Sequence, residues 1–254
     1  MAARRPDPVR VAGAVREQAE AIADWLGILD EADWSRPSPL PEWTVTHLVL
    51  HLAQALRTIA EARPTTASPL TAETYLATLP PAAAEIRDRE RASEASDPVR
   101  SYATQLERAN SVLEKLPGDV VQAPRGPLRT ADFLATRALE LVVHADDLGR
   151  TLPDSPPPLR RSATAVTVRM LADVLATRAP GRSVEVRIPP HAAVQCIPGP
   201  RHTRGTPPTV IETDPVTWLR LATGRVTWAE ALEVGRVSAS GERSDLSVYL
   251  PLVS

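Results

Sequence analysis

Apolar residues recur at intervals of three and four along most of the first 150 positions, which is the spacing of one face of an α-helix. Four segments have this pattern, and we expect helices at about 11–29, 45–59 and 99–116 and in a segment that starts at a capping Thr130. A fifth helical pattern, at about 80–91, is rich in charge and is expected outside the core. The short connections favour an antiparallel helical bundle.

The pattern changes after 151–158, a proline-rich stretch that we expect to be a rigid, extended linker. One more helix is predicted at about 163–175, and from position 184 apolar residues alternate at a spacing of two, as in a half-buried strand. We expect strands at 184–188, 193–197, 209–213, 237–241 and 246–250, with short helices at 215–221 and 226–232. The chain is therefore predicted to be multidomain, with an α-helical domain at 8–150 and a small α+β domain at 159–254.

Composition narrows the class of protein without identifying it. The 254 residues are 43% hydrophobic and 24% charged, as in globular proteins, and the formal net charge is only −2. With aromatic residues at 4%, we expect no nucleic-acid partner. Cys196 is the only cysteine, which excludes an intrachain disulfide and a thiolate-rich zinc site. No signal peptide or membrane-spanning stretch is recognisable, so a cytoplasmic protein without a membrane partner is expected.

The strongest candidate for chemistry is the run RALELVVHADD at residues 137–147. On a helix, Glu140 and His144 lie one turn apart on the same face, and Arg137 and Asp147 continue the same stripe. A carboxylate and an imidazole in apolar surroundings offer two ligands to a metal such as zinc. The alternative is an ordinary intrahelical pair, which this spacing also produces.

A third ligand is expected from the second predicted helix, which contains His47 and His51. The apolar pattern places His51 beside the core face and His47 one turn earlier, at the start of the helix. His51 is the preferred ligand because it lies deeper, whereas a hydrogen-bonded histidine at a helix end is the alternative for His47. Bundle cores are a common place for metal sites built from facing helices.

These residues resemble a known family. The runs LPEWTVTHLVLHLA (40–53) and RALELVVHADD (137–147) resemble the mycothiol-dependent maleylpyruvate isomerase family, which belongs to the DinB-like four-helix metalloproteins. The resemblance covers roughly residues 10–155. It implies that His51, Glu140 and His144 bind a divalent metal, with zinc as the expected ion. His47 departs from the family pattern, which more often has a polar or acidic residue at that position.

The second half resembles the bacterial sterol-carrier-like domain that actinobacterial members of this family carry. The similar runs are PPHAAVQ (189–195), GPRHTRGTPP (199–208), DPVTWLRLATG (214–224) and VSASG (237–241). Arg201, His202 and Arg204 form a basic loop that is a candidate for binding a substrate carboxylate, with a solvated turn as the alternative. The family's catalytic arginine has no clear counterpart here, so no catalytic residue is assigned.

The resemblance implies a metal-dependent isomerase or transferase that uses mycothiol, or a similar low-molecular-weight thiol, on a small electrophilic substrate. Three protein ligands leave open positions on the metal, as in catalytic sites. Arg137 and Asp147 are candidates for orienting the ligands, with a helix-surface ion pair as the alternative. The competing hypotheses are a non-catalytic lipid- or small-molecule-binding protein and a metal-bound regulatory or structural module. The chain is expected to be a monomer or a homodimer.

Overall fold

The structure is a computed structural model that describes residues 6–78, 97–199 and 209–253. It divides into two compact units that meet in the sequence between Val166 and Thr167, within helix α7 (Arg161–Arg178). The charged helix expected at 80–91 lies outside the described residues. No helix in the described ranges is long and apolar enough to cross a membrane.

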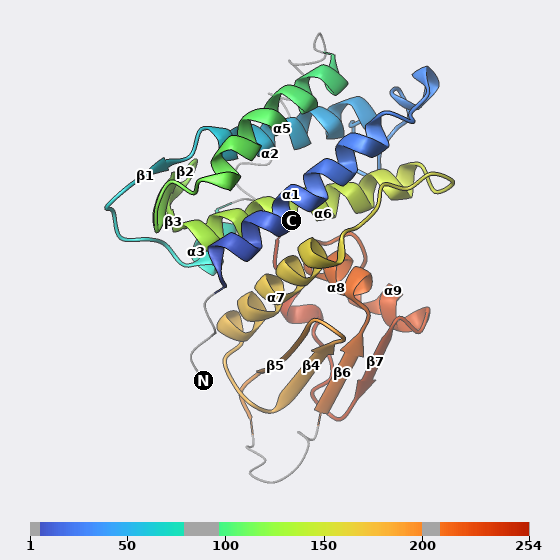
Figure 1. Cartoon of the computed structure of the whole chain (residues 1–254). Helices are drawn as coiled ribbons and strands as arrows, with labels where there is room; N and C mark the ends of the chain where they lie inside the picture. Colours follow the sequence, from blue (N-terminus) through green and yellow to red (C-terminus); the bar gives the residue numbers. More distant parts are fainter. Residues whose placement is uncertain (1–5, 79–96, 200–208, 254) are drawn as a thin grey trace. The chain divides into compact units, whose positions relative to one another are not determined.

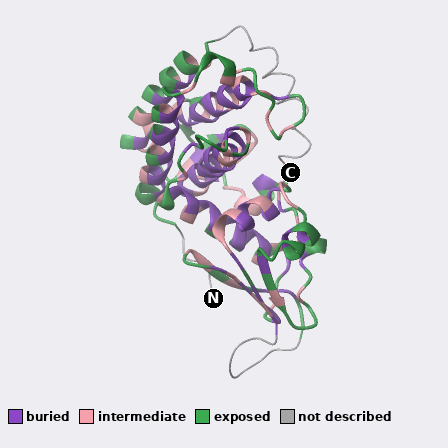
Figure 2. Cartoon of the chain, turned by 90° about the vertical axis from the view of Figure 1, so that its right-hand side faces the viewer, coloured by how far each residue is buried: buried purple, intermediate pink, exposed green. Residues whose placement is uncertain are grey.

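The first unit is built on four helices: α1 (Pro8–Leu26), α2 (Val45–Ala60), α5 (Pro98–Glu114) and α6 (Thr130–Thr151). Helices α1 and α2 each pack against both α5 and α6, which confirms the predicted bundle (Figure 1). The buried side chains line the helix faces that turn toward one another, while exposed residues cover the outside (Figure 2). Since α2 packs on α6, two segments almost ninety residues apart in sequence share one core.

Local chemistry explains where two of these helices begin. Pro8 and Pro98 occupy the first helical positions of α1 and α5, where proline's missing N–H costs nothing. The preceding Asp7 and Asp97 accept backbone N–H hydrogen bonds from the first turns. Thr130, which was expected as a cap, is instead the first residue of α6, and its hydroxyl donates to the carbonyl of Gly118.

A small sheet and a short helix complete this unit. Strands β1 (Arg63–Pro64), β2 (Val120–Ala123) and β3 (Gly126–Arg129) form an antiparallel sheet in the order β1-β2-β3, and α3 spans Ala72–Leu76. The turn between β2 and β3 is formed by Pro124 and Arg125. Strands of two to four residues are too short to show an alternating pattern, which explains why the sequence did not predict them.

The segment after α6, which was expected to be a rigid, extended linker, is hydrogen-bonded to side chains of α1. The indole N–H of Trp25 donates to the carbonyl of Ser155 (2.7 Å), and the fully buried Gln18 donates to the carbonyl of Pro158 (3.0 Å). The side-chain oxygen of Gln18 also accepts the backbone N–H of Arg160 (2.8 Å). These hydrogen bonds make the proline-rich stretch part of the helical unit.

The second unit is a four-stranded sheet with helices, as the alternating pattern predicted. Strands β4 (Val184–Ile188), β5 (Ala192–Cys196), β6 (Thr209–Thr213) and β7 (Val237–Ser240) lie in the order β5-β4-β6-β7. The β4–β6 pair is parallel, and the other pairs are antiparallel. Helices α8 (Pro215–Ala222) and α9 (Trp228–Glu233) contribute the buried Trp218 and Trp228 to the core.

The prediction of a strand at 246–250 is wrong. A single 3-10 turn, Ser247–Tyr249, occupies this segment. The carboxylate of Asp245 accepts the backbone N–H of Ser247 at 2.8 Å, a local hydrogen bond that favours a turn over a strand.

Candidate metal centre

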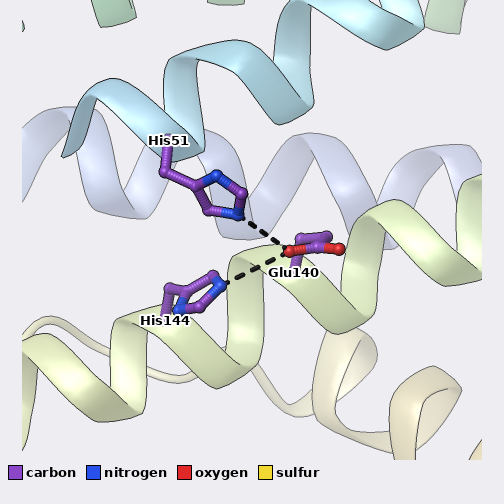
Figure 3. Close-up of side chains that lie close together, drawn as sticks. All are labelled: His51, Glu140 and His144. Atoms are coloured by element: carbon purple, nitrogen blue, oxygen red, sulfur yellow. Dashed lines mark hydrogen bonds and ion pairs between the residues drawn. The ribbon is translucent and has the colours of Figure 1, made fainter. Parts of the chain in front are cut away.

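Two histidines and one glutamate converge between α2 and α6. Nε2 of His51 lies 3.1 Å from Oε2 of Glu140, and Nε2 of His144 lies 3.4 Å from the same oxygen (Figure 3). One potential ligand atom from each of the three residues lies within 4.8 Å of the others. The imidazole rings of the two histidines stand nearly perpendicular, at 89°, with their centroids 4.8 Å apart. Both nitrogens therefore point at the oxygen that a shared cation would contact.

The helices bring these groups together by ordinary packing. His51 lies in the second turn of α2 beside buried Leu48 and Leu52, and Glu140 and His144 lie one turn apart on α6. The three side chains remain 11–18% exposed, so the cluster is accessible from solvent. Two nitrogen donors and one carboxylate oxygen match the ligand preferences of zinc and similar divalent ions.

The cluster favours an ionised carboxylate. Burial by itself raises the pKa of Glu140, but hydrogen bonds from His144 and His51, with the positive charges of His51 and Arg137, hold that pKa well below its usual value. A carboxylate must be deprotonated to bind a metal, so the site keeps Glu140 in the form that a cation requires.

Each of the two candidate ligands on α6 has a charged neighbour on the same helix. Oδ2 of the fully buried Asp147 lies 3.0 Å from Nδ1 of His144, and Arg150 approaches the other oxygen of Asp147 at 3.7 Å. At the other end, Nη2 of Arg137 lies 3.9 Å from Oε1 of Glu140. The structure thus brings Arg137 and Asp147 to the cluster, although neither offers it a ligand atom.

His47 has a different role from His51. Its Nδ1 accepts the backbone N–H of Thr44 at 3.0 Å and lies 2.8 Å from the Thr44 hydroxyl, which forms a capping box at the start of α2. Since Nδ1 is used as an acceptor in the cap, His47 closes the helix end. Among the described residues, the group that can hold a metal contains His51 and not His47.

The ring of Trp43 packs against the two histidines of the cluster. The sequence did not predict this contact. The side chain of Trp43 is 4% exposed, and its ring centroid lies 5.2 Å from that of His51 and 6.5 Å from that of His144. The signal for this contact was its position immediately before Thr44, the cap of the helix that carries His51.

The other candidates from the sequence lie apart from this cluster or outside the described residues. Arg201, His202 and Arg204 fall within 200–208, which the structure does not describe. Cys196 is fully buried in β5, and burial raises the pKa of its thiol to about 11, so it is not a nucleophile near neutral pH.

The fold and this cluster define a class of protein: a two-unit chain whose helical bundle groups side chains that could hold a metal ion, followed by a small α+β unit. The sequence model of the mycothiol maleylpyruvate isomerase N-terminal domain matches residues 15–149, and the chain belongs to this family. The model of the bacterial SCP ortholog family matches residues 160–252.

Solved structures agree with this assignment of fold. The mycothiol-dependent maleylpyruvate isomerase is 19% identical, with a TM-score of 0.56, and a histidine-to-alanine mutant of it is 18% identical, with a TM-score of 0.57. Each match covers 93% of this chain and 95% of the other. At this identity the likeness shows a shared fold. A search of curated proteins found no match.

Proposed function

We propose that the helical unit binds one divalent metal ion, with zinc as the expected ion, through His51, Glu140 and His144. The observation that carries this proposal is the convergence of one ligand atom from each residue within 4.8 Å, from two separate helices. The low pKa of Glu140 and the partial exposure of all three side chains also support it. Three protein ligands leave room for an exogenous ligand, as in catalytic centres.

The protein then uses a low-molecular-weight thiol of the mycothiol type in an isomerisation or transfer reaction on a small electrophilic substrate. A divalent cation at this position lowers the pKa of a thiol that binds it, which supplies a nucleophile near neutral pH. Membership of the mycothiol maleylpyruvate isomerase N-terminal domain family supports the use of such a thiol. If the thiolate adds to a double bond and leaves again after rotation about that bond, the reaction is an isomerisation. If it displaces a leaving group or opens a ring and stays attached, the reaction is a transfer.

The side chains around the cluster have separate tasks in this reaction. His51, Glu140 and His144 hold the ion, and Asp147 keeps the proton of His144 on Nδ1 so that Nε2 is free to bind. The buried ring of Trp43 covers part of the cluster and limits access of water to the two imidazoles.

Calorimetric titration of the protein with mycothiol tests this function. We expect measurable binding to the metal-loaded protein and none after removal of the metal with a chelator. Equal binding in both states would contradict a role for the metal in holding the thiol. Glu61→Ala, which removes an exposed carboxylate paired with Arg57 on the bundle surface, serves as a control that should bind as the wild type does.

The match of residues 160–252 to the bacterial SCP ortholog family favours a second candidate, a protein that binds an apolar small molecule. In that case, the metal-binding helical unit has no turnover. Organic extraction of the purified protein would then release a stoichiometric lipid, and added thiol would produce neither heat nor product. The absence of an extractable ligand, together with metal-dependent thiol binding, would exclude it.

A further inference from the structure

Arg137 is a buried cation with weak hydrogen bonds. Its side chain is 8% exposed, and Nη2 lies 3.9 Å from Oε1 of Glu140, beyond hydrogen-bond distance. Nε donates to the hydroxyl of Thr136 at 3.3 Å and Nη1 to that of Thr58 at 3.5 Å, both of which are long. The guanidinium also lies over the ring of Phe133, 5.8 Å from its centroid. In the described part of the chain, its charge is therefore opposed only by Glu140.

Two ion pairs between described side chains flank the cluster before any metal binds. Arg137 faces Glu140, and Arg150 lies 3.7 Å from Asp147, so two cations accompany two carboxylates. Imidazoles bind a metal in their neutral form and add no charge. A divalent cation held by His51, Glu140 and His144 therefore brings a positive charge that none of these side chains compensates.

An uncompensated charge in a mostly buried site acts more strongly than the same charge in water. Neutral ligands leave this charge in place, whereas anions remove part of it. We propose that Arg137 makes the metal centre selective for anionic ligands, so that thiols and carboxylate-bearing substrates bind there as anions. This inference rests on the metal centre proposed above. Arg137 acts through its charge, and no contact between its guanidinium and the incoming ligand is required.

Two substitutions on the same helix separate this effect from a general structural role. Arg137→Gln removes a positive charge and keeps a hydrogen-bond donor, while Asp147→Asn removes a negative charge and keeps an acceptor for Nδ1 of His144. The proposal predicts opposite results: weaker anion binding and tighter metal binding in Arg137→Gln, and tighter anion binding with weaker metal binding in Asp147→Asn. Structural damage would instead weaken both kinds of binding in both variants.

The experiment uses the full chain loaded with Co²⁺, whose visible absorption reports a change of ligands. Thiocyanate is titrated as the anionic probe and imidazole as a neutral one, and Co²⁺ affinity is measured by competition with a chelator. We expect Arg137→Gln to bind thiocyanate about tenfold more weakly than the wild type, with imidazole affinity unchanged, and Arg137→Lys to restore thiocyanate binding.

The outcomes distinguish the two proposals. If the wild type takes up no Co²⁺, the metal centre is absent, and both proposals fail. If Co²⁺ binds but Arg137→Gln binds thiocyanate as tightly as the wild type, only the selectivity proposal fails. Equal weakening of thiocyanate and imidazole binding would also overturn it. If Arg137→Gln does not fold, the Asp147→Asn variant tests the selectivity proposal instead. Thiocyanate binding to Asp147→Asn that is unchanged or weaker than in the wild type would contradict a role for the charge of these side chains.

Discussion

The buried carboxylate of Asp147 lies 3.0 Å from Nδ1 of His144, while Nε2 of the same ring faces Glu140. Because an ionised carboxylate can only accept, Nδ1 of His144 carries the proton when a metal takes the lone pair of Nε2. Pairs of this kind orient metal-binding imidazoles in many proteins. The contact with Asp147 therefore fixes the orientation of the His144 ring in the metal-free protein.

Replacing Asp147 with alanine should therefore weaken metal binding. We expect Zn²⁺ affinity to fall by roughly 10- to 100-fold, because His144 loses the group that fixes its tautomer and orientation. Chelator competition measures the affinity, and urea unfolding of the metal-free protein reports any general loss of stability. An affinity equal to that of the wild type in a folded variant would show that Asp147 does not support the centre.

His47 should matter for stability and not for metal binding. His47→Ala removes the acceptor for the Thr44 backbone N–H, and we expect a loss of about 1 kcal/mol in the free energy of unfolding. Glutamine at this position can form the same capping box, so His47→Gln should retain most of the stability. Elemental analysis should find unchanged metal in both variants. A variant that stays stable but loses its metal would make His47 a ligand.

Cys196 should be unreactive in the folded protein. Since burial raises the pKa of its thiol to about 11, only about one molecule in a thousand carries a thiolate near pH 8. A disulfide reagent such as dithionitrobenzoate should modify Cys196 only after unfolding in concentrated guanidinium chloride. Rapid modification of the native protein would show that this thiol is accessible and could serve in the reaction.

The low pKa of Glu140 predicts how the metal-free protein responds to acid. The folded state holds the pKa of Glu140 well below its ordinary value of 4.5, so the unfolded state binds the proton first as the pH falls. The contribution of Glu140 to stability is complete above about pH 4.5 and is lost below it, as the pH falls through the folded-state pKa. Wild type and Glu140→Gln should therefore differ most in urea unfolding at neutral pH and converge in acid. A difference that grows on acidification would contradict this sign.

The bundle and the cluster could be predicted because both depend on helical periodicity. Glu140 and His144 are one turn apart on any helix, and the apolar pattern of α2 placed His51 beside the core. The roles of Arg137 and Asp147 depend on rotamers and distances, which a spacing of three residues does not determine. The packing of Trp43 against the cluster was not predicted because its contacts reach across to another helix.

Other elements could not be predicted from the hydrophobic pattern of the sequence, or were predicted wrongly. Strands β1, β2 and β3 are too short for alternation to be recognised. The stretch 151–158 was predicted to be a rigid, extended linker because prolines dominate it. Its backbone carbonyls also accept hydrogen bonds from the side chains of Trp25 and Gln18, more than 100 residues earlier, which the pattern could not show. Residues 246–250 alternate in polarity as a strand does, but a hydrogen bond to Asp245 forms a turn instead.

The most direct test is the metal content of the purified protein and of three variants, His51→Ala, Glu140→Ala and His144→Ala. Elemental analysis after dialysis against trace metal should find about one divalent ion per wild-type chain and far less in each variant. The Glu61→Ala control should match the wild type. Metal-free wild-type protein, or equal metal in wild type and variants, would contradict a centre built from His51, Glu140 and His144.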